Sequence, residues 1–182
     1  KMGRRNDAKS LYKKLLTENP QDMQEDIEDA HFYLAECDHE NDDISKLVQF
    51  ISGFPGSSQI SNAWRLIARH HSEKVDTTAE IDAMQKMAEA DPYNPNTMNA
   101  YAWRMTELNR NLDDALIKAR KGVDLADVSG KPMIMDTEAE ILWLMDRTKE
   151  AIDMINRAIE MEPEEEYYKE QLEKFTEALQ ES

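Results

Sequence analysis

Proline recurs along this chain of 182 residues at a nearly constant interval. Pro20, Pro55, Pro92 and Pro163 are separated by 35, 37 and 71 residues, and the last gap is close to two units. Each proline follows a stretch in which apolar residues recur three and four positions apart, which is the spacing of one helical face. Proline ends a helix because it lacks an N–H donor and crowds the preceding turn. The chain is therefore predicted to be a tandem array of helical units.

Alanine marks a second helix in each unit. Ala30, Ala68, Ala102 and Ala139 recur at intervals of 38, 34 and 37 residues, each inside an amphipathic stretch. A side chain this small lets two helix backbones approach closely, so the unit is a helix, a short turn, a second helix and a proline. Thr77 with Glu80 three positions later is the pattern of a capping box. Helices are predicted over residues 4–18, 22–39, 43–53, 58–73, 78–90, 96–109, 112–126, 132–145, 148–161 and 164–180.

Composition excludes several classes of protein. Acids outnumber bases 38 to 22, and the formal net charge of −16 argues against binding to nucleic acid or to an anionic membrane surface. Five glycines and six prolines are too few for a turn-rich β-sandwich, and one cysteine cannot form an internal disulfide. No apolar run approaches the roughly 18 residues of a membrane-spanning helix, so no membrane insertion is expected.

The sequence carries no recognisable catalytic or cofactor motif. GxSxG, HExxH, GxxxxGK[ST] and GxGxxG are all absent. The segment 36–43 offers carboxylate, imidazole and thiol groups, but it has no glycine for a calcium loop and is interpreted as a helix-capping turn. We therefore predict no enzyme activity, no catalytic residue, no metal site and no cofactor.

The repeating residues resemble the tetratricopeptide repeat, a helical hairpin of 34 residues. The copy from Met135 to Pro163 matches best, and the copy from Met98 to Asp127 departs from the pattern at Gly122 and Asp127. The resemblance implies an all-α, right-handed superhelical solenoid. It divides a single domain, 1–182, into a half repeat at 1–20, repeats at 22–55, 58–92, 96–127 and 132–163, and a capping helix at 164–180. The best copy matches at Ala139, Leu142, Ala151, Ile155, Ala158 and Pro163.

Curvature of such a solenoid places the first helix of each repeat on the concave side. The residues expected in this groove flank the alanine-centred core on the same helices. Ile27, His31 and Leu34 would extend the groove in the second unit. In a competing interpretation, Arg69 only pairs with Glu73, and the tryptophans pack between units. The predicted groove residues are Arg65, Arg69, Asn99, Trp103, Asp136, Glu140 and Trp143.

The predicted function is a non-catalytic scaffold that binds a peptide or a partner surface in this groove. A suitable ligand would be an extended segment with a carboxylate near an apolar side chain, since arginine binds carboxylates with two parallel hydrogen bonds. The alternative is an accessory or oligomerisation module of a larger thioredoxin-like or other extracytoplasmic enzyme, and the half repeat at the start favours a longer protein. The chain is expected to be soluble, either in the cytoplasm or outside it in a bacterium, and a homo-oligomer is compatible with the sequence.

Overall fold

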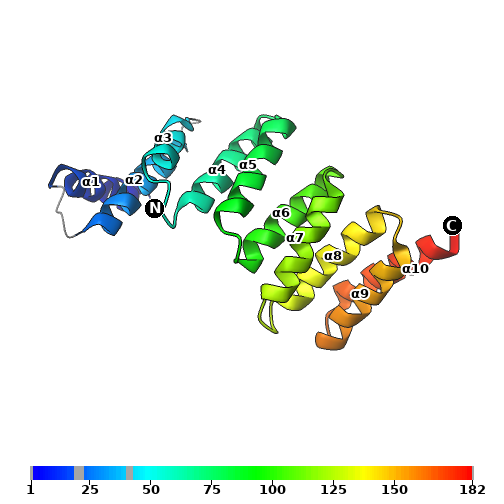
Figure 1. Ribbon diagram of the computed structural model, residues 1–182. Coiled ribbons are helices and arrows are strands. Elements are labelled where there is room, and N and C mark those ends of the chain that lie inside the picture. The colour runs from blue at the N-terminus through cyan, green and yellow to red at the C-terminus, as the bar shows by residue number, and fades with distance from the viewer. Residues whose placement is uncertain (1, 19–22, 40–42, 182) are drawn as a thin grey trace. The chain divides into compact units, whose positions relative to one another are not determined.

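The computed structural model describes residues 2–18, 23–39 and 43–181, and within these ranges it contains ten helices and no strand (Figure 1). Each predicted helix is present, and each boundary agrees with the prediction to within two residues. None of the helices described is long and apolar enough to cross a lipid bilayer. The helices are α1 (Met2–Glu18), α2 (Gln24–His39), α3 (Ser45–Gly53), α4 (Ile60–Glu73), α5 (Thr77–Ala90), α6 (Pro95–Leu108), α7 (Leu112–Leu125), α8 (Lys131–Leu144), α9 (Thr148–Met161) and α10 (Glu166–Glu181).

The helices gather into two compact units, Lys1–Ala90 with α1 to α5 and Asp91–Ser182 with α6 to α10. The predicted single domain, and its division into repeats, stays a prediction. Pro20, the closing residue of the predicted half repeat, lies outside the described residues. In both units, consecutive helices pack as hairpins, as the pairs α4–α5, α6–α7 and α8–α9 show (Figure 1).

The first unit has two kinds of core. The buried residues of α4 and α5 include several alanines, of which Ala63, Ala68 and Ala83 are each at most 2% exposed. Between α2 and α3 the contacts are aromatic, with the rings of Phe32 and Phe50 5.6 Å apart. Aromatic rings keep helix backbones further apart than alanine does. We therefore expect the two helices of the α2–α3 hairpin to lie further apart than those of the α4–α5 hairpin.

The second unit is held together by alanines at its helix crossings. Ala102, Ala115, Ala119, Ala139 and Ala151 are all completely buried. The sequence departs from the repeat at Gly122, and the structure gives the reason. A Cβ at this position would lie 3.2 Å from the Cγ2 atom of Ile134 and 3.4 Å from the carbonyl oxygen of Pro95. Glycine therefore lets α7 lie against α6 and α8 at the same place.

A buried ion pair links two of these helices. The carboxylate of Glu138 on α8, whose side chain is 3% exposed, accepts a hydrogen bond of 2.9 Å from Nε of Arg120 on α7. A carboxylate this deeply buried requires such a partner, because removal from water disfavours its charge. The pair therefore fixes which faces of α7 and α8 meet.

The turns within hairpins use left-handed backbone. Asn109, Asn111 and Asp146 have φ values of 48°, 49° and 59°, and asparagine and aspartate tolerate this conformation better than most residues. Asn109 is the C-cap of α6, and the following N–H, that of Arg110, bonds to the carbonyl of Met105 at 3.0 Å. The three residues 109–111 thus form the turn between α6 and α7.

The capping box predicted at Thr77 and Glu80 is wrong. Asp76 caps α5 instead, because its Oδ1 accepts a hydrogen bond of 3.1 Å from the N–H of Ala79. Glu80 is 4% exposed and lies in the packed part of the helix. Asp127, where the repeat pattern expects proline, has a similar role before α8: its Oδ1 accepts a hydrogen bond of 2.8 Å from the N–H of Gly130.

Enlarging a crossing alanine should destabilise the fold. Ala102→Leu and Ala139→Leu each add three carbons where the native side chain is 0% exposed. We expect each variant to lose about 1–3 kcal/mol of unfolding free energy, as overpacked cores do. Urea denaturation measures this loss. Ala100→Leu, at an exposed position of α6, is the matched control and should melt like the parent protein. Equal stability of all three variants would contradict the packing described here.

Val75 is a strained residue whose replacement should stabilise the protein. It joins α4 to α5 at φ 60°, although β-branched side chains disfavour this region, and its side chain is 85% exposed. Val75→Asn should raise the unfolding free energy by roughly 1 kcal/mol, since little packing is lost. Thermal melting measures the gain. Val128→Asn, at a 77% exposed position of ordinary φ, should have no such effect. A gain of the same size in both variants would show that backbone strain is not its source.

Candidate functional site

The arginine pair lies on the exposed face of α4. Arg65 and Arg69 are one turn apart, and both are exposed. Nε of Arg69 lies 3.9 Å from a carboxylate oxygen of Glu73, and these two side chains are 52% and 64% exposed. The competing interpretation, pairing of Arg69 with Glu73, is therefore present in the structure. An exposed pair at this distance contributes about 0–1 kcal/mol, so both guanidinium groups remain accessible to a stronger acceptor.

Asn99 and Trp103 occupy successive turns of α6. Trp103 is 38% exposed, so much of its indole ring contacts solvent. The side-chain oxygen of Asn99 is buried and has no hydrogen-bond partner among the described residues. Buried acceptors in folded proteins are nearly always paired. This part of α6 therefore presents an apolar surface beside an amide oxygen that lacks a donor.

Asp136, Glu140 and Trp143 lie together on α8, and their side chains face α10. The ammonium group of Lys174 on α10 donates to both carboxylate oxygens of Glu140, at 2.6 and 2.7 Å. The same nitrogen lies 4.1 Å from the ring centroid of Trp143, and the rings of Trp143 and Phe175 are 5.9 Å apart. The chain's own lysine thus occupies the acidic and aromatic surface of α8.

Asp136 is the most perturbed acid of the described residues. It is 7% exposed, and its Oδ1 has no hydrogen-bond partner in the described part of the chain. The pKa of Asp136 is raised to about 6, first by burial and then by the charge of Glu140, while Lys174 opposes both effects. Burial also raises the pKa of Tyr167 on α10, with a second contribution from the charge of Asp136. Two carboxylates on α8 therefore face the ammonium group of Lys174.

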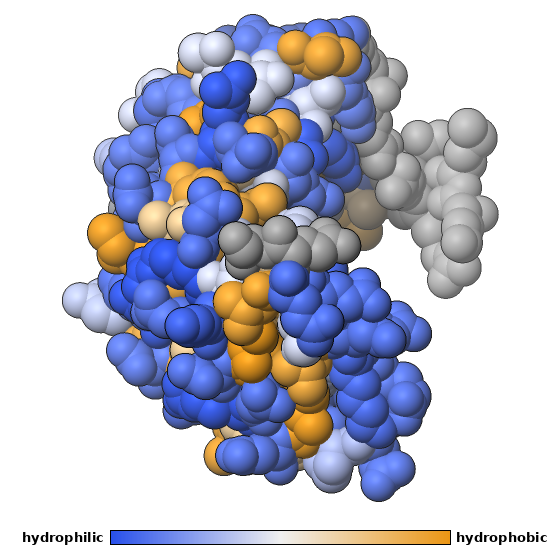
Figure 2. Space-filling view, turned by 90° about the vertical axis from the view of Figure 1, so that its right-hand side faces the viewer, coloured by the Kyte–Doolittle hydropathy of each residue, from blue (hydrophilic) through white to orange (hydrophobic). Residues whose placement is uncertain are grey.

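The structure gathers the predicted groove residues into separate groups. Arg65 and Arg69 belong to the first unit, and Asn99, Trp103, Asp136, Glu140 and Trp143 belong to the second. Whether they line one groove stays a prediction. The molecular surface is mainly hydrophilic on the face that Figure 2 shows, with hydrophobic residues gathered in a few short strips.

Metal binding gains no support from the described part of the chain. It contains no group of three or more histidine, cysteine or acidic side chains placed to hold a metal ion. Most of the acidic turn interpreted as a helix cap, residues 38–42, lies outside the residues whose side chains are described.

Two features were missed in the sequence. Lys174 lies 34 positions from Glu140, so no local spacing pointed to their contact. An aromatic pocket between α2 and α3 was also not predicted, although His31 and Leu34, which line it, were expected to extend the groove. The closely spaced Phe50 and Phe54 at the end of a short helix were the available signal for that pocket.

Several solved structures are similar to this chain. The crystal structure of MamA matches with a TM-score of 0.62 at 18% identity, covering 92% of this chain and 87% of that chain. The first tetratricopeptide domain of Spaghetti (RPAP3), bound to the HSP90 peptide SRMEEVD, matches with a TM-score of 0.57 at 21% identity, covering 68% of this chain and 95% of that chain. TTC0263, a tetratricopeptide protein of Thermus thermophilus, matches with a TM-score of 0.50 at 18% identity, covering 96% and 92%.

These similarities establish the fold class predicted from the repeats. The chain has the all-α, right-handed solenoid fold of tetratricopeptide-repeat proteins. No protein-family model matches the sequence, and no curated protein matches it.

The raised pKa of Asp136 predicts a pH-dependent stability. The folded protein binds this proton more tightly than the unfolded chain, whose aspartates titrate near 3.8. The free energy of unfolding should therefore fall as pH rises from about 4 through 6, and level off above 7. Asp136→Asn removes the penalty, so the variant should be more stable than the parent by about 1–3 kcal/mol at pH 8.

Urea denaturation between pH 4 and pH 8 measures this difference, which should shrink toward acidic pH. The matched control is Asp124→Asn, at an exposed position of α7. If the advantage of Asp136→Asn were independent of pH, titration of Asp136 could not be its cause.

Proposed function

We propose that this chain is a non-catalytic scaffold that binds a peptide or a partner protein's surface along the first helices of its hairpins. The observation that carries the proposal is a solvent-exposed tryptophan on α6, Trp103, which is 38% exposed. Trp103 offers a large contact area at low entropic cost, and Asn99 lies one turn before it on the same helix.

The partner is an extended segment that carries carboxylates near an apolar side chain. Arg65 and Arg69 supply the two guanidinium groups for those carboxylates, and their solvent exposure leaves them accessible. The peptide bound to the similar RPAP3 domain, SRMEEVD, has this kind of composition, with three acids beside methionine and valine. A similar fold does not transfer that ligand, but the peptide is a suitable first probe.

The surface of α8 contributes less to the proposed binding. It consists of Asp136, Glu140 and Trp143. Lys174 already satisfies Glu140 and covers Trp143, so a partner meets these side chains only beside α10. Within the first unit the proposed contacts are made by α4, and within the second unit by α6. Because both helices are already folded, binding orders only the partner and the contacting side chains.

The test is binding of fluorescently labelled SRMEEVD, together with an array of acidic peptides, to the parent and to Arg65→Glu/Arg69→Glu. Charge reversal should weaken binding by tenfold or more, on the order of the loss of one charged hydrogen-bonded contact, while circular dichroism and melting stay unchanged. Trp103→Ala should weaken binding by a similar factor. Lys149→Glu/Arg157→Glu, two reversals on α9, is the control for net charge and should bind like the parent.

Unchanged binding by a folded Arg65→Glu/Arg69→Glu variant would remove the arginines from the site. Equal weakening by the α9 control would mean that only the overall charge acts. If no peptide on the array binds the parent protein, an acidic peptide ligand is the wrong partner class.

A further inference from the structure

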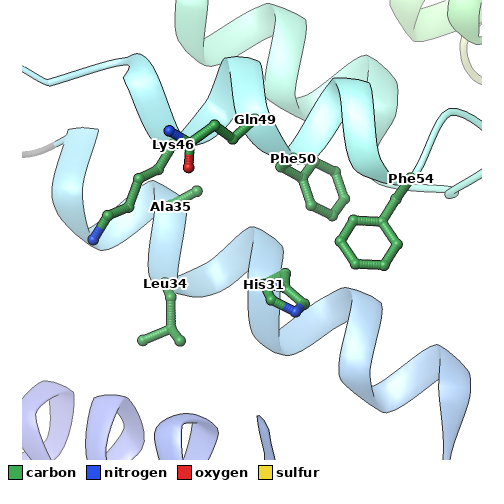
Figure 3. A pocket seen from close by; sticks show the side chains of 7 residues that line it. All are labelled: His31, Leu34, Ala35, Lys46, Gln49, Phe50 and Phe54. Carbon is green, nitrogen blue, oxygen red and sulfur yellow. The ribbon is translucent and has the colours of Figure 1, made fainter.

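A pocket opens between α2 and α3 in the first unit, and none of its residues belongs to the arginine pair or to the surfaces of α6 and α8. The hollow measures about 380 Å³, and Figure 3 shows the rings of His31, Phe50 and Phe54 gathered on one side of it. Ala35 and Phe50, which are 2% and 3% exposed, form its floor. The residues that line it are His31, Leu34, Ala35, Lys46, Gln49, Phe50 and Phe54.

The aromatic wall of the pocket is held rigid by ring contacts. The imidazole of His31 lies 5.0 Å from the ring of Phe54, and that ring lies 5.4 Å from Phe50. Phe50 in turn contacts Phe32, behind the wall, at 5.6 Å. The helix that carries Phe50 is only nine residues long, and Phe54 follows as its C-cap. The pocket is thus preformed by bulky rings where the other hairpins are closed by alanines.

The rim of the pocket carries polar groups that can donate hydrogen bonds. No carboxylate lines it among the described residues, although the sequence has 38 acids. The polar groups at the rim are the ammonium of Lys46, the amide of Gln49 and the imidazole of His31, and all three residues are exposed. Each can donate a hydrogen bond, and lysine also attracts an anion. An apolar floor with a few convergent donors is the usual composition of a small-ligand site.

We propose that this pocket binds a monocarboxylate with an apolar body the size of one aromatic ring or branched aliphatic chain. The body contacts Phe50, Phe54 and Ala35, and the carboxylate faces Lys46 and Gln49. A hollow of about 380 Å³ is large enough for such a group, since ligand pockets begin at roughly 300 Å³. The same chemistry occurs in a free organic acid and at the C-terminal residue of a peptide, so the experiment separates these two sources.

This proposal does not require the groove of the proposed function. It uses His31 and Leu34, which the sequence placed in an extension of that groove, but it needs neither the arginine pair nor Trp103. Loss of binding at one location therefore leaves the other unaffected, and variants of each serve as controls for the other.

The test uses three probes on the full chain: N-acetyl-phenylalanine, its C-terminal amide and 3-phenylpropionate. Nuclear magnetic resonance of the histidine ring protons reports binding, because ring currents of a bound probe shift the signal of His31, which is assigned from a His31→Gln variant. N-acetyl-phenylalanine should shift that signal saturably, with an affinity at least tenfold higher than that of its amide.

Three variants test the parts of the pocket. Lys46→Glu should weaken binding of the carboxylate probe at least tenfold and leave the weak binding of the amide unchanged. Lys46→Arg, which keeps the positive charge, should bind the carboxylate probe like the parent. Lys74→Glu, the same charge reversal near the end of α4, should bind like the parent. Phe54→Ala should weaken both probes, and thermal melting confirms that each variant is folded.

The outcomes decide between the sources as well. Equal binding of 3-phenylpropionate and N-acetyl-phenylalanine supports a free acid, and stronger binding of the peptide-like probe supports a peptide C-terminus. The proposal is overturned if no probe shifts His31 saturably, or if the carboxylate and amide probes bind equally and Lys46→Glu has no effect.

Discussion

Close approach of helices at buried alanines is the constraint on which the rest of the structure depends. In the second unit, six alanines are completely buried and one glycine lets a third helix approach. Because the backbones are so near, each hairpin has one register, and the outward faces of α6 and α8 are fixed with it. The positions of Asn99 and Trp103 therefore follow from residues that have no contact with a ligand. Between α2 and α3, where the rings of Phe32 and Phe50 are buried beside Ala30 and Ala35, the same hairpin design leaves a pocket instead.

Charge is organised around a few buried acids. Glu138 is paired with Arg120 across two helices, whereas one oxygen of Asp136 has no partner among the described residues. The difference is one of geometry, since both acids are almost equally buried on α8. A chain with a net charge of −16 thus keeps most of its acids in solvent, and among the described residues it buries only Glu80, Asp136 and Glu138.

The sequence predicts local features of this fold well and long-range contacts poorly. Helix boundaries follow from apolar spacing and from prolines, so all ten described helices were found, and Ala102 and Ala139 were correctly assigned to crossings. The N-cap of α5 was misassigned by one residue, because aspartate and threonine both suit that position. The contact of Lys174 with Glu140 and the wall formed by His31 and Phe54 depend on how helices meet, which spacing along one helix does not encode. The predicted thioredoxin-like neighbour, the oligomeric state and the compartment stay predictions.

The contact between α10 and α8 determines where the chain can be shortened. A fragment that ends at Pro163 would retain every predicted repeat, yet it would lose Lys174 and Phe175. Glu140 and Asp136 would then repel each other without the counter-ion that Lys174 provides, and the ring of Trp143 would lose its contact with Phe175. Such a fragment would expose an apolar and acidic surface suited to a helix that carries a lysine beside an aromatic ring, as α10 of a second copy does with Lys174 and Phe175. Limited proteolysis near residue 163 would therefore expose this surface of α8 and allow another molecule to bind there.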